Sequence, residues 1–476
     1  MDYVDLAFTP ALKQAQLIRS GELSPLELTE LYLSRIEQLN PKLGCYFAVM
    51  AEAAIADATA KTEQLANGAN RDALPQFFGV PISIKDLNPV AGHPCCYGVK
   101  AARNRIAESD DGIVNQIKQA GFVILGKTAT SQLGTLPYSE PPGFSPARNP
   151  WHLDYTPGGS SGGAAASLAA GLCAIAQGSD GGGSIRGPAF CCGLVGLKPS
   201  KGRISNAPGG ELLHGVATNG PLGHTVADVA ALLDELAGHK LGDPYWLSDP
   251  ETSFRAATQR SPQALRIGYV TAIAPIGEAQ ADCKQAVELT AKRLADLGHH
   301  LEPIEFPDLT ALIEPFTVVW QCVVDQANVP WIVLEKMNRW LLGRARRISS
   351  GAYLRSLSQL QTVARQIVIA CDPYDVVVLP TYLHPTIRVG EWRRLRSAKT
   401  LDNIIRWIAP CPPFNASGQP ALAIPTGFDT NGIPVGVQLV GRPAQDALLL
   451  SLGAQLETAH PWHHRPAIAM ESSLPD

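Results

Sequence analysis

Two glycine-flanked serine clusters lie close together in the sequence, GGSSGG at 158–163 and GGGS at 181–184. Consecutive glycines leave backbone N–H groups uncovered by side chains and let a ligand approach closely. Such N–H groups can stabilise the oxyanion that forms when a carbonyl is attacked. Either cluster alone is typical of a turn. The two in this order and at this spacing predict a site that contains both Ser160 and Ser184.

The residues around the clusters predict elements that would bring the two serines together. Alanine is the best helix former, so we expect a helix over 164–170, followed by a short buried strand over 173–177. Ser160 and Ser184 would then lie at the two ends of a helix–strand unit, where the chain can turn back on itself.

Lys85 ends another predicted strand, over 78–86 (FGVPISIKD). The lysine could guard an exposed sheet edge, or it could enter a pocket, where burial disfavours its charged form. Downstream, 121–128 (GFVILGKT) match the phosphate-loop pattern. A phosphate loop needs a flexible segment between its glycines, after a strand. Here the four residues between Gly121 and Gly126 are predicted to be a strand, and a predicted helix over 111–120 precedes them, so we expect no nucleotide site.

The rest of the chain alternates helices and strands, and we expect one continuous α/β domain over 1–476. A capping box at 24–27 (SPLE) predicts a helix that ends at the Asn-Pro pair 40–41. The segment 307–410 is largely helical, contains five tryptophans and could line an acyl pocket. The other predicted elements are helices over 51–66, 279–297 and 445–459 and strands over 266–270, 301–306, 375–380, 421–426 and 435–440.

Composition and charge argue against several classes of protein. The net charge of −4 and the 17% of charged residues argue against a nucleic-acid or acidic-membrane partner. The N-terminus lacks the basic start and apolar core of a signal peptide, and no apolar run reaches membrane-spanning length. The ten cysteines lack metal-ligand spacing. We expect them to be core thiols in a reducing cytoplasm.

The stretch 156–203 resembles the signature of the amidase signature family of serine hydrolases. The likeness extends to PISIKD at 81–86, AGFVILGKT at 120–128, PFNASGQPALAIPTG at 413–427 and VGVQLVGRP at 435–443. The resemblance implies an α/β fold with a large, central, mixed and twisted sheet flanked by helices on both sides. It also implies hydrolysis of a small-molecule carboxamide to a carboxylic acid and ammonia or an amine, through an acyl-enzyme and without a metal or organic cofactor.

The family uses a Ser-Ser-Lys triad, and the matching residues are Ser184 as the nucleophile, Ser160 as the bridging serine after a cis peptide bond, and Lys85 as the base. Serine is a weak nucleophile until a base takes its proton, and lysine is a base only when neutral. Ser160 could accept from Ser184 and donate to Lys85, and so relay the proton. The resemblance also implies oxyanion donors and loop-supporting residues: Gly181, Gly182 and Gly183 for the oxyanion, and Ser161, Ser179, Asp180 and Arg186 for the loop.

Two residues depart from the family pattern. Gly181 stands where many relatives carry threonine or isoleucine, and Gly187 where a larger residue often follows the Ser-Ile-Arg triplet. Either could widen the pocket or loosen the loop. GSDGGGSIR, CCGL at 191–194 and KDL at 85–87 are similar to the branch that contains cyclic-amide (nylon oligomer) hydrolases and general acylamidases. The sequence determines neither the amide (aliphatic, aryl or cyclic) nor the oligomeric state, for which a homodimer is one option.

Two other functions remain open. GGSSG at 158–162 matches the nucleophile elbow of α/β-hydrolases, with Ser160 as the nucleophile, although no apolar strand precedes it. The chain could also be the amidase subunit of a glutamyl/aspartyl-tRNA amidotransferase, which shares the triad but needs partner proteins, ATP and glutamine-derived ammonia. The less typical GSDGGGSIRG and the loose 307–410 segment argue against this second function. Activity without partners would decide.

Overall fold

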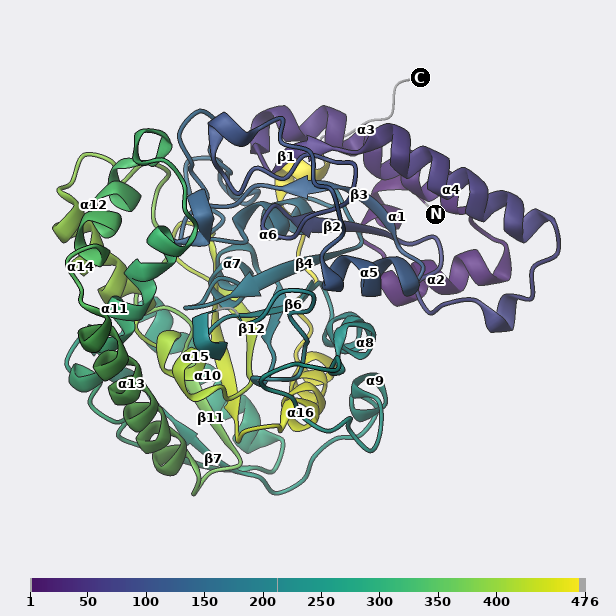
Figure 1. Cartoon of the computed structure of the whole chain (residues 1–476). Helices are drawn as coiled ribbons and strands as arrows, with labels where there is room; N and C mark the ends of the chain where they lie inside the picture. The colour runs from purple at the N-terminus through teal and green to yellow at the C-terminus, as the bar shows by residue number, and fades with distance from the viewer. Residues whose placement is uncertain (1, 212, 471–476) are drawn as a thin grey trace.

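An 11-stranded mixed sheet runs through the molecule (Figure 1). The computed structural model describes residues 2–211 and 213–470. Its strands are β1 (Tyr46–Val49), β2 (Pro81–Lys85), β3 (Val123–Thr128), β4 (Ile175–Asp180), β5 (Val195–Lys198), β6 (Thr218–Gly223), β7 (Arg266–Tyr269), β10 (His300–Pro303), β11 (Val376–Pro380), β12 (Ala421–Phe428) and β13 (Pro434–Gly441), with a separate pair β8 (Ala272–Ile273) and β9 (Gly277–Glu278). The strand order in the large sheet is β1-β3-β2-β4-β6-β5-β12-β13-β11-β7-β10.

Parallel and antiparallel pairs are segregated along this sheet. β3, β2 and β4 pair in parallel, and so do β11, β7 and β10 towards the other end. The strands between these two groups pair antiparallel, as does β1 with β3. The carboxyl ends of the parallel strands β2 and β4 therefore lie on the same side of the sheet, and Lys85 and Asp180 are the last residues of these two strands.

Helices cover both faces of the sheet. They are α1 (Tyr3–Ala7), α2 (Ala11–Ser20), α3 (Pro25–Leu43), α4 (Ala51–Ala66), α5 (Gly112–Gln119), α6 (Gly162–Ala169), α7 (Arg186–Cys192), α8 (Val226–Leu236), α9 (Phe254–Ala257), α10 (Ala281–Asp296), α11 (Thr310–Gln326), α12 (Lys336–Ala345), α13 (Ser350–Cys371), α14 (Ser397–Ile408), α15 (Pro412–Ser417) and α16 (Asp446–Ala459). Gly196 of β5 faces Ala189 of α7, whereas Leu422 of the neighbouring β12 faces Gly453 of α16. Leu422 pairs with Leu197, so these two residues point to the same face of the sheet. Successive residues of a strand point to opposite faces, so Gly196 points to the other face, and α7 and α16 lie on opposite faces of the sheet. The predicted fold class is confirmed.

Most of the predicted elements are present with shifted ends. The helix over 51–66 coincides with α4, and 121–128 contain β3 rather than a phosphate loop. The strand predicted over 173–177 is displaced: β4 runs to Asp180, so the second glycine cluster follows it directly. The predicted helix end at 40–41 is wrong, because α3 continues through Pro41 to Leu43 and ends at left-handed Gly44, whose N–H donates to Asn40 O. Proline is tolerated there because it removes one hydrogen bond in the last turn only.

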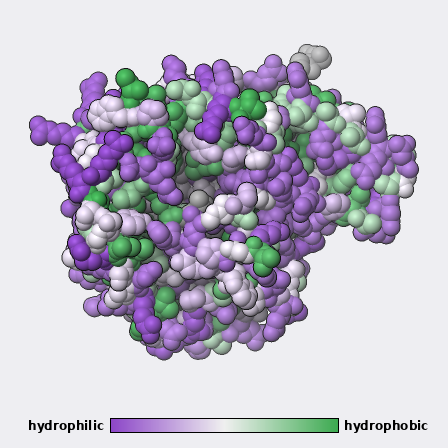
Figure 2. Space-filling model, in the orientation of Figure 1, coloured by the Kyte–Doolittle hydropathy of each residue, from purple (hydrophilic) through white to green (hydrophobic). Residues whose placement is uncertain are grey.

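The cysteines are core residues, as predicted: all ten are free thiols, and nine of them are buried. None of the described helices has the length and hydrophobicity that crossing a bilayer requires. On the face drawn in Figure 2, hydrophilic residues predominate and hydrophobic ones are scattered among them. Figure 1 shows α11, α12, α13 and α14 gathered beside one part of the sheet, away from α1 to α5.

Candidate active site

Lys85 lies in the interior of the protein at the end of β2, with no exposed surface. β2 pairs with β3 on one side and β4 on the other, so the lysine cannot guard a sheet edge. Of the two interpretations of Lys85, the edge guard is therefore wrong. The side chain extends from an internal strand into the region of the serines.

The ammonium nitrogen of Lys85 is surrounded by serine oxygens. Its Nζ lies 2.8 Å from Ser160 Oγ, 2.8 Å from Ser161 Oγ and 3.0 Å from Ser179 Oγ, with the Ser179 carbonyl oxygen at 3.3 Å. Burial lowers the pKa of Lys85 to about 7, against the opposing effect of the Asp180 carboxylate. A lysine with this pKa is half neutral near pH 7, so it can accept a proton from a hydroxyl that contacts it.

The loop before α6 places Ser160 beside this lysine. The Gly159–Ser160 peptide bond is cis, as the family resemblance implied. Ser139 holds the loop: its Oγ lies 3.2 Å from Ser160 O and accepts from Gly162 N–H at 3.1 Å. A Cβ on Gly159 would lie 2.5 Å from Tyr138 N, so only glycine fits at that position. No sequence motif had identified Ser139.

Ser184 lies in the turn between β4 and α7, and Asp180 organises that turn. The Asp180 carboxylate accepts from the N–H groups of Gly183 at 2.7 Å and Ile185 at 3.1 Å. Gly183 has φ of 118°, a conformation that side-chain-bearing residues rarely adopt. The Ser184 carbonyl accepts from Ser161 N–H at 3.3 Å, so the two predicted clusters are in direct contact.

One of the predicted oxyanion donors, the Gly183 N–H, is already engaged in the structure, since it donates to Asp180. Within residues 2–211 and 213–470, the N–H groups of Gly181, Gly182 and Ser184 have no hydrogen-bond acceptor. Those three N–H groups are the ones left to bind a developing oxyanion.

The hydroxyls of Ser160 and Ser184 form no hydrogen bond with each other in the part of the chain that the structure describes. The side chain of Ser184 is buried apart from 8% of its surface. Catalytic hydrogen bonds are often long before substrate binds and tighten only in the complex. The structure thus contains the contact between Ser160 and Lys85, and the relay from Ser184 through Ser160 to Lys85 stays a prediction.

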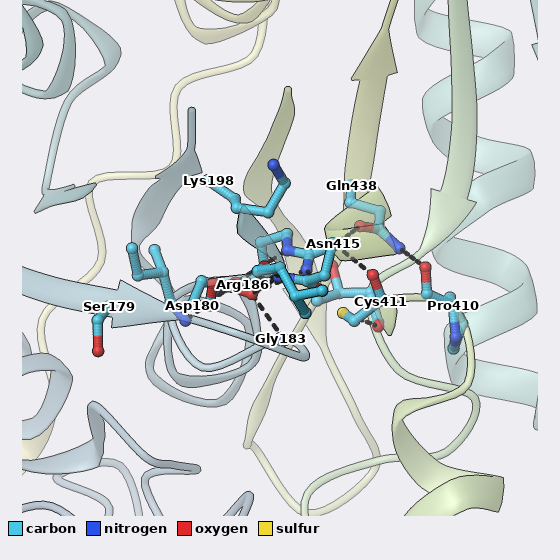
Figure 3. Close-up of polar contacts among 12 residues, drawn as sticks. Ser179, Asp180, Gly183, Arg186, Lys198, Pro410, Cys411, Asn415 and Gln438 are labelled. Carbon is cyan, nitrogen blue, oxygen red and sulfur yellow. Dashed lines mark hydrogen bonds and ion pairs between the residues drawn. The ribbon is translucent and has the colours of Figure 1, made fainter. Parts of the chain in front are cut away.

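A buried ion pair connects the turn that carries Ser184 to β13 and α15 (Figure 3). Arg186 donates from Nη2 to Asp180 Oδ1 at 2.9 Å and from Nη1 to Gln438 Oε1 at 2.9 Å. Asn415 donates to the Asp180 carboxylate at 2.9 Å. Burial alone would raise the pKa of Asp180, but the charge of Arg186 and these hydrogen bonds hold it well below its usual range. Asp180 is therefore a carboxylate at every working pH.

Sequence reasoning missed Asn415 and Gln438 as supporting residues. Both lie in stretches that carry the family resemblance, 413–427 and 435–443, and this was the only signal that could have identified them. Lys198, also drawn in Figure 3, is another buried lysine, but its Nζ donates to Pro199 O at 2.7 Å and makes no hydrogen bond to Ser160 or Ser184 among the described residues. Burial lowers the pKa of Lys198 to about 7 as well.

The space beside each of the two departures from the family pattern is filled by an aromatic side chain. A Cβ on Gly181 would lie 3.0 Å from the Trp320 ring, and a Cβ on Gly187 would lie 1.6 Å from Tyr382 Oη. Trp320 and Tyr382 thus occupy the space that larger residues at 181 and 187 would need. Whether either glycine widens the pocket relative to other members of the family stays a prediction.

Comparison with known proteins gives a consistent result. A model of the family "Amidase" matches residues 27–450. The chain is 49% identical over 453 residues to the "Putative amidase" of Synechocystis sp. (strain ATCC 27184 / PCC 6803 / Kazusa), covering 95% of this chain and 89% of that protein. It is similar to the structure of 6-aminohexanoate cyclic dimer hydrolase complexed with substrate, at a TM-score of 0.90 and 30% identity over 97% and 99% of the two chains. The likeness to a component of the glutamyl-tRNA(Gln) amidotransferase of Thermotoga maritima, at a TM-score of 0.78 and 24% identity over 98% and 97%, extends to the fold alone.

Proposed function

The chain belongs to the amidase signature family and is a hydrolase of amide carbon–nitrogen bonds, and from that membership we propose that Ser184 is its nucleophile and Lys85 its base. The observation that carries the proposal is the buried Lys85 amine, with a pKa of about 7 and its Nζ 2.8 Å from Ser160 Oγ. No other lysine or histidine among the described residues makes a hydrogen bond to a serine of the two glycine clusters.

The first half of the reaction forms an ester on Ser184. The Ser184 hydroxyl gives its proton to Ser160, whose own proton passes to the neutral amine of Lys85. The Ser184 oxygen bonds to the carbonyl carbon, and the carbonyl electron pair moves onto oxygen, where the N–H groups of Gly181 and Gly182 stabilise it. Collapse of this intermediate breaks the C–N bond, while the proton returns from Lys85 through Ser160 to the departing nitrogen.

The second half hydrolyses the ester by the same route. Water gives a proton through Ser160 to Lys85 and bonds to the acyl carbon. The proton then returns to Ser184 as the carboxylic acid leaves. Each step uses only one amine, two hydroxyls and backbone N–H groups. We propose a linear carboxamide as the substrate, and the cyclic dimer of 6-aminohexanoate belongs in any test panel because of the enzyme to which this chain is similar.

Ser184→Ala tests the proposal, because it removes one oxygen and leaves the turn intact. The purified chain alone should hydrolyse amides, and the variant should lose that activity while keeping its thermal unfolding midpoint. A fluorophosphonate should label Ser184 in the wild type, with the labelled peptide identified by mass spectrometry. Labelling of Ser160 instead would support the nucleophile-elbow function and contradict the proposal. Activity that appears only with added partner proteins and ATP would support membership of an amidotransferase complex.

A further inference from the structure

A cavity with hydrocarbon walls opens onto Ser184. Ser184 and Gly182 are among the residues that line it, and half of its lining comes from α11, α12 and α14, within the 307–410 segment. Its volume, counted as the space open to the centre of a water-sized sphere, is about 90 Å³. On the same measure one water molecule needs roughly 10–15 Å³. The cavity can therefore hold a group of the substrate beside the reacting carbonyl.

None of the residues that line this cavity is an aspartate, glutamate, lysine, arginine or histidine. The two threonine side chains in the wall are already paired: Thr135 Oγ1 lies 2.7 Å from Asn338 Oδ1, and Thr317 Oγ1 donates to Ile313 O. The hydroxyl of Tyr382 has no hydrogen-bond partner among the described residues, but it lies against Gly187 of α7, and Gly187 is not part of the wall. A charged group in the cavity would thus lose its water without gaining a partner of opposite charge.

Two stacked aromatic rings form the part of the wall nearest the oxyanion donors. The rings of Phe316 and Trp320 have centroids 6.0 Å apart and planes 15° apart. Trp320 is fixed by donation from its Nε1 to Thr135 O at 3.1 Å. Its ring lies 3.0 Å from where a Cβ on Gly181 would be, and the Phe316 ring lies 3.7 Å from the same point on Gly182. A substituent next to the scissile bond would meet these rings first.

We infer that the substrate carries an uncharged hydrocarbon group, aliphatic or aryl, next to the scissile amide, and that this group sits between α11 and α14. The inference rests on the proposed function and specifies its substrate class. It excludes substrates that would place a free carboxylate or ammonium in the cavity. Affinity comes from the apolar area removed from water, so it grows with the length of the group until the cavity is full.

Matched amides test the inference. On the acyl side the pair is hexanamide and 6-ammoniohexanamide; on the amine side it is N-pentylacetamide and N-(5-ammoniopentyl)acetamide. In at least one pair, kcat/KM of the neutral member should exceed that of the charged member about 100-fold or more, the scale of leaving a buried charge unpaired. In the same series each added methylene should raise kcat/KM about fourfold. Equal kcat/KM for neutral and charged members in both pairs would overturn the inference.

A labelling measurement separates failure of the inference from failure of the proposed function. The second-order rate of Ser184 labelling is compared for a hexyl and a 6-ammoniohexyl fluorophosphonate, which needs no amide turnover. Faster labelling by the hexyl reagent supports the hydrocarbon pocket even if no amide of the panel is cleaved. Equal labelling rates contradict the pocket, whereas absence of label on Ser184 contradicts the proposed nucleophile.

A charge placed in the wall provides a gain-of-function test. Ile405 lines the cavity from α14 and is partly exposed, so a polar residue there leaves the core intact. Ile405→Glu should raise kcat/KM for the ammonium-bearing amide relative to its neutral partner by about fivefold, the scale of one partly exposed ion pair. Ile405→Gln, which has the same shape without the charge, should not. An equal change in both variants would place the substituent elsewhere.

Discussion

The pH dependence of hydrolysis gives a quantitative test of Lys85 as the base. Only the neutral amine can accept a proton. With the ordinary lysine pKa of 10.5, the neutral fraction at pH 7 would be about 0.0003, and at a pKa of about 7 it is about one half. Burial of the side chain at the end of β2 therefore increases the active fraction roughly 1,600-fold at neutral pH.

The expected profile follows from the same pKa. Between pH 6 and pH 8 the neutral fraction of Lys85 rises about tenfold, so kcat/KM should rise about tenfold and level off above pH 8. The assay measures kcat/KM for one neutral amide in buffers of constant ionic strength. Lys85→Met should abolish the activity, because the methionine thioether cannot take the proton.

Lys198 provides a matched control, because burial lowers its pKa to about 7 as well although it makes no hydrogen bond to Ser160 or Ser184 among the described residues. Lys198→Met should keep the inflection near pH 7. For both lysines the pKa is lower in the folded than in the unfolded chain, so the unfolded chain binds more protons between about pH 7 and pH 10. The free energy of unfolding should therefore rise across this range, and less steeply in Lys198→Met.

Two results would refute this reasoning. A kcat/KM that stays flat between pH 6 and pH 9 would show that no group with a pKa near 7 limits the reaction. Loss of the inflection in Lys198→Met, with activity retained, would assign the titration to Lys198 and leave Lys85 without its role. Both results are independent of whether the substrate is linear or cyclic.

Three further substitutions test the residues that hold the site in place. Gly187→Ala would place a Cβ 1.6 Å from Tyr382 Oη and should lower the free energy of unfolding by at least about 1–3 kcal/mol. The control Gly427→Ala, with no atom within 4 Å of its Cβ, should change this free energy by less than about 0.5 kcal/mol. Equal unfolding midpoints of the two variants in urea would contradict this expectation. Asp180→Asn leaves a buried guanidinium unpaired and should cost about 3–5 kcal/mol in the same assay, so a cost below 1 kcal/mol would contradict the pair's role. Ser160→Ala should reduce amide hydrolysis by about 10²–10⁴-fold and hydrolysis of the matched ester less, because an amine leaves poorly unless it is protonated. Equal losses would remove Ser160 from that step.

The sequence was sufficient to predict the local parts of the site. Ser160, Ser184 and the glycines around them are close in the chain, and the order and spacing of the two clusters predicted that they form one site. Lys85 could be placed at the end of a strand, but alternation of residues could not tell an internal strand from an edge strand. That choice depends on β3 and β4, which pair with β2 from positions about 40 and 90 residues away.

The parts that could not be predicted depend on contacts between distant segments. Asn415 of α15 and Gln438 of β13 reach Asp180 and Arg186 only because β12 pairs with β5 across a long stretch of sequence, and β13 pairs with β12. The occupation of Gly183 N–H by Asp180 depends on the exact course of one turn, which no residue pattern specifies. Likewise, the fit of Gly187 against a tyrosine nearly 200 residues away is visible only in three dimensions.

Asp180 meets two demands that conflict, and Arg186 resolves the conflict. The turn that carries Ser184 needs a carboxylate, because Asp180 accepts N–H groups on both sides of the serine. The same negative charge raises the pKa of Lys85 and would, if it acted alone, favour the protonated amine that cannot serve as a base. The guanidinium of Arg186 lies on the side of Asp180 towards β13, and its opposite charge compensates the carboxylate. The turn keeps its acceptor, while burial outweighs the Asp180 charge and keeps the lysine half neutral near pH 7. Loss of Arg186 would leave that charge uncompensated beside both the base and the turn.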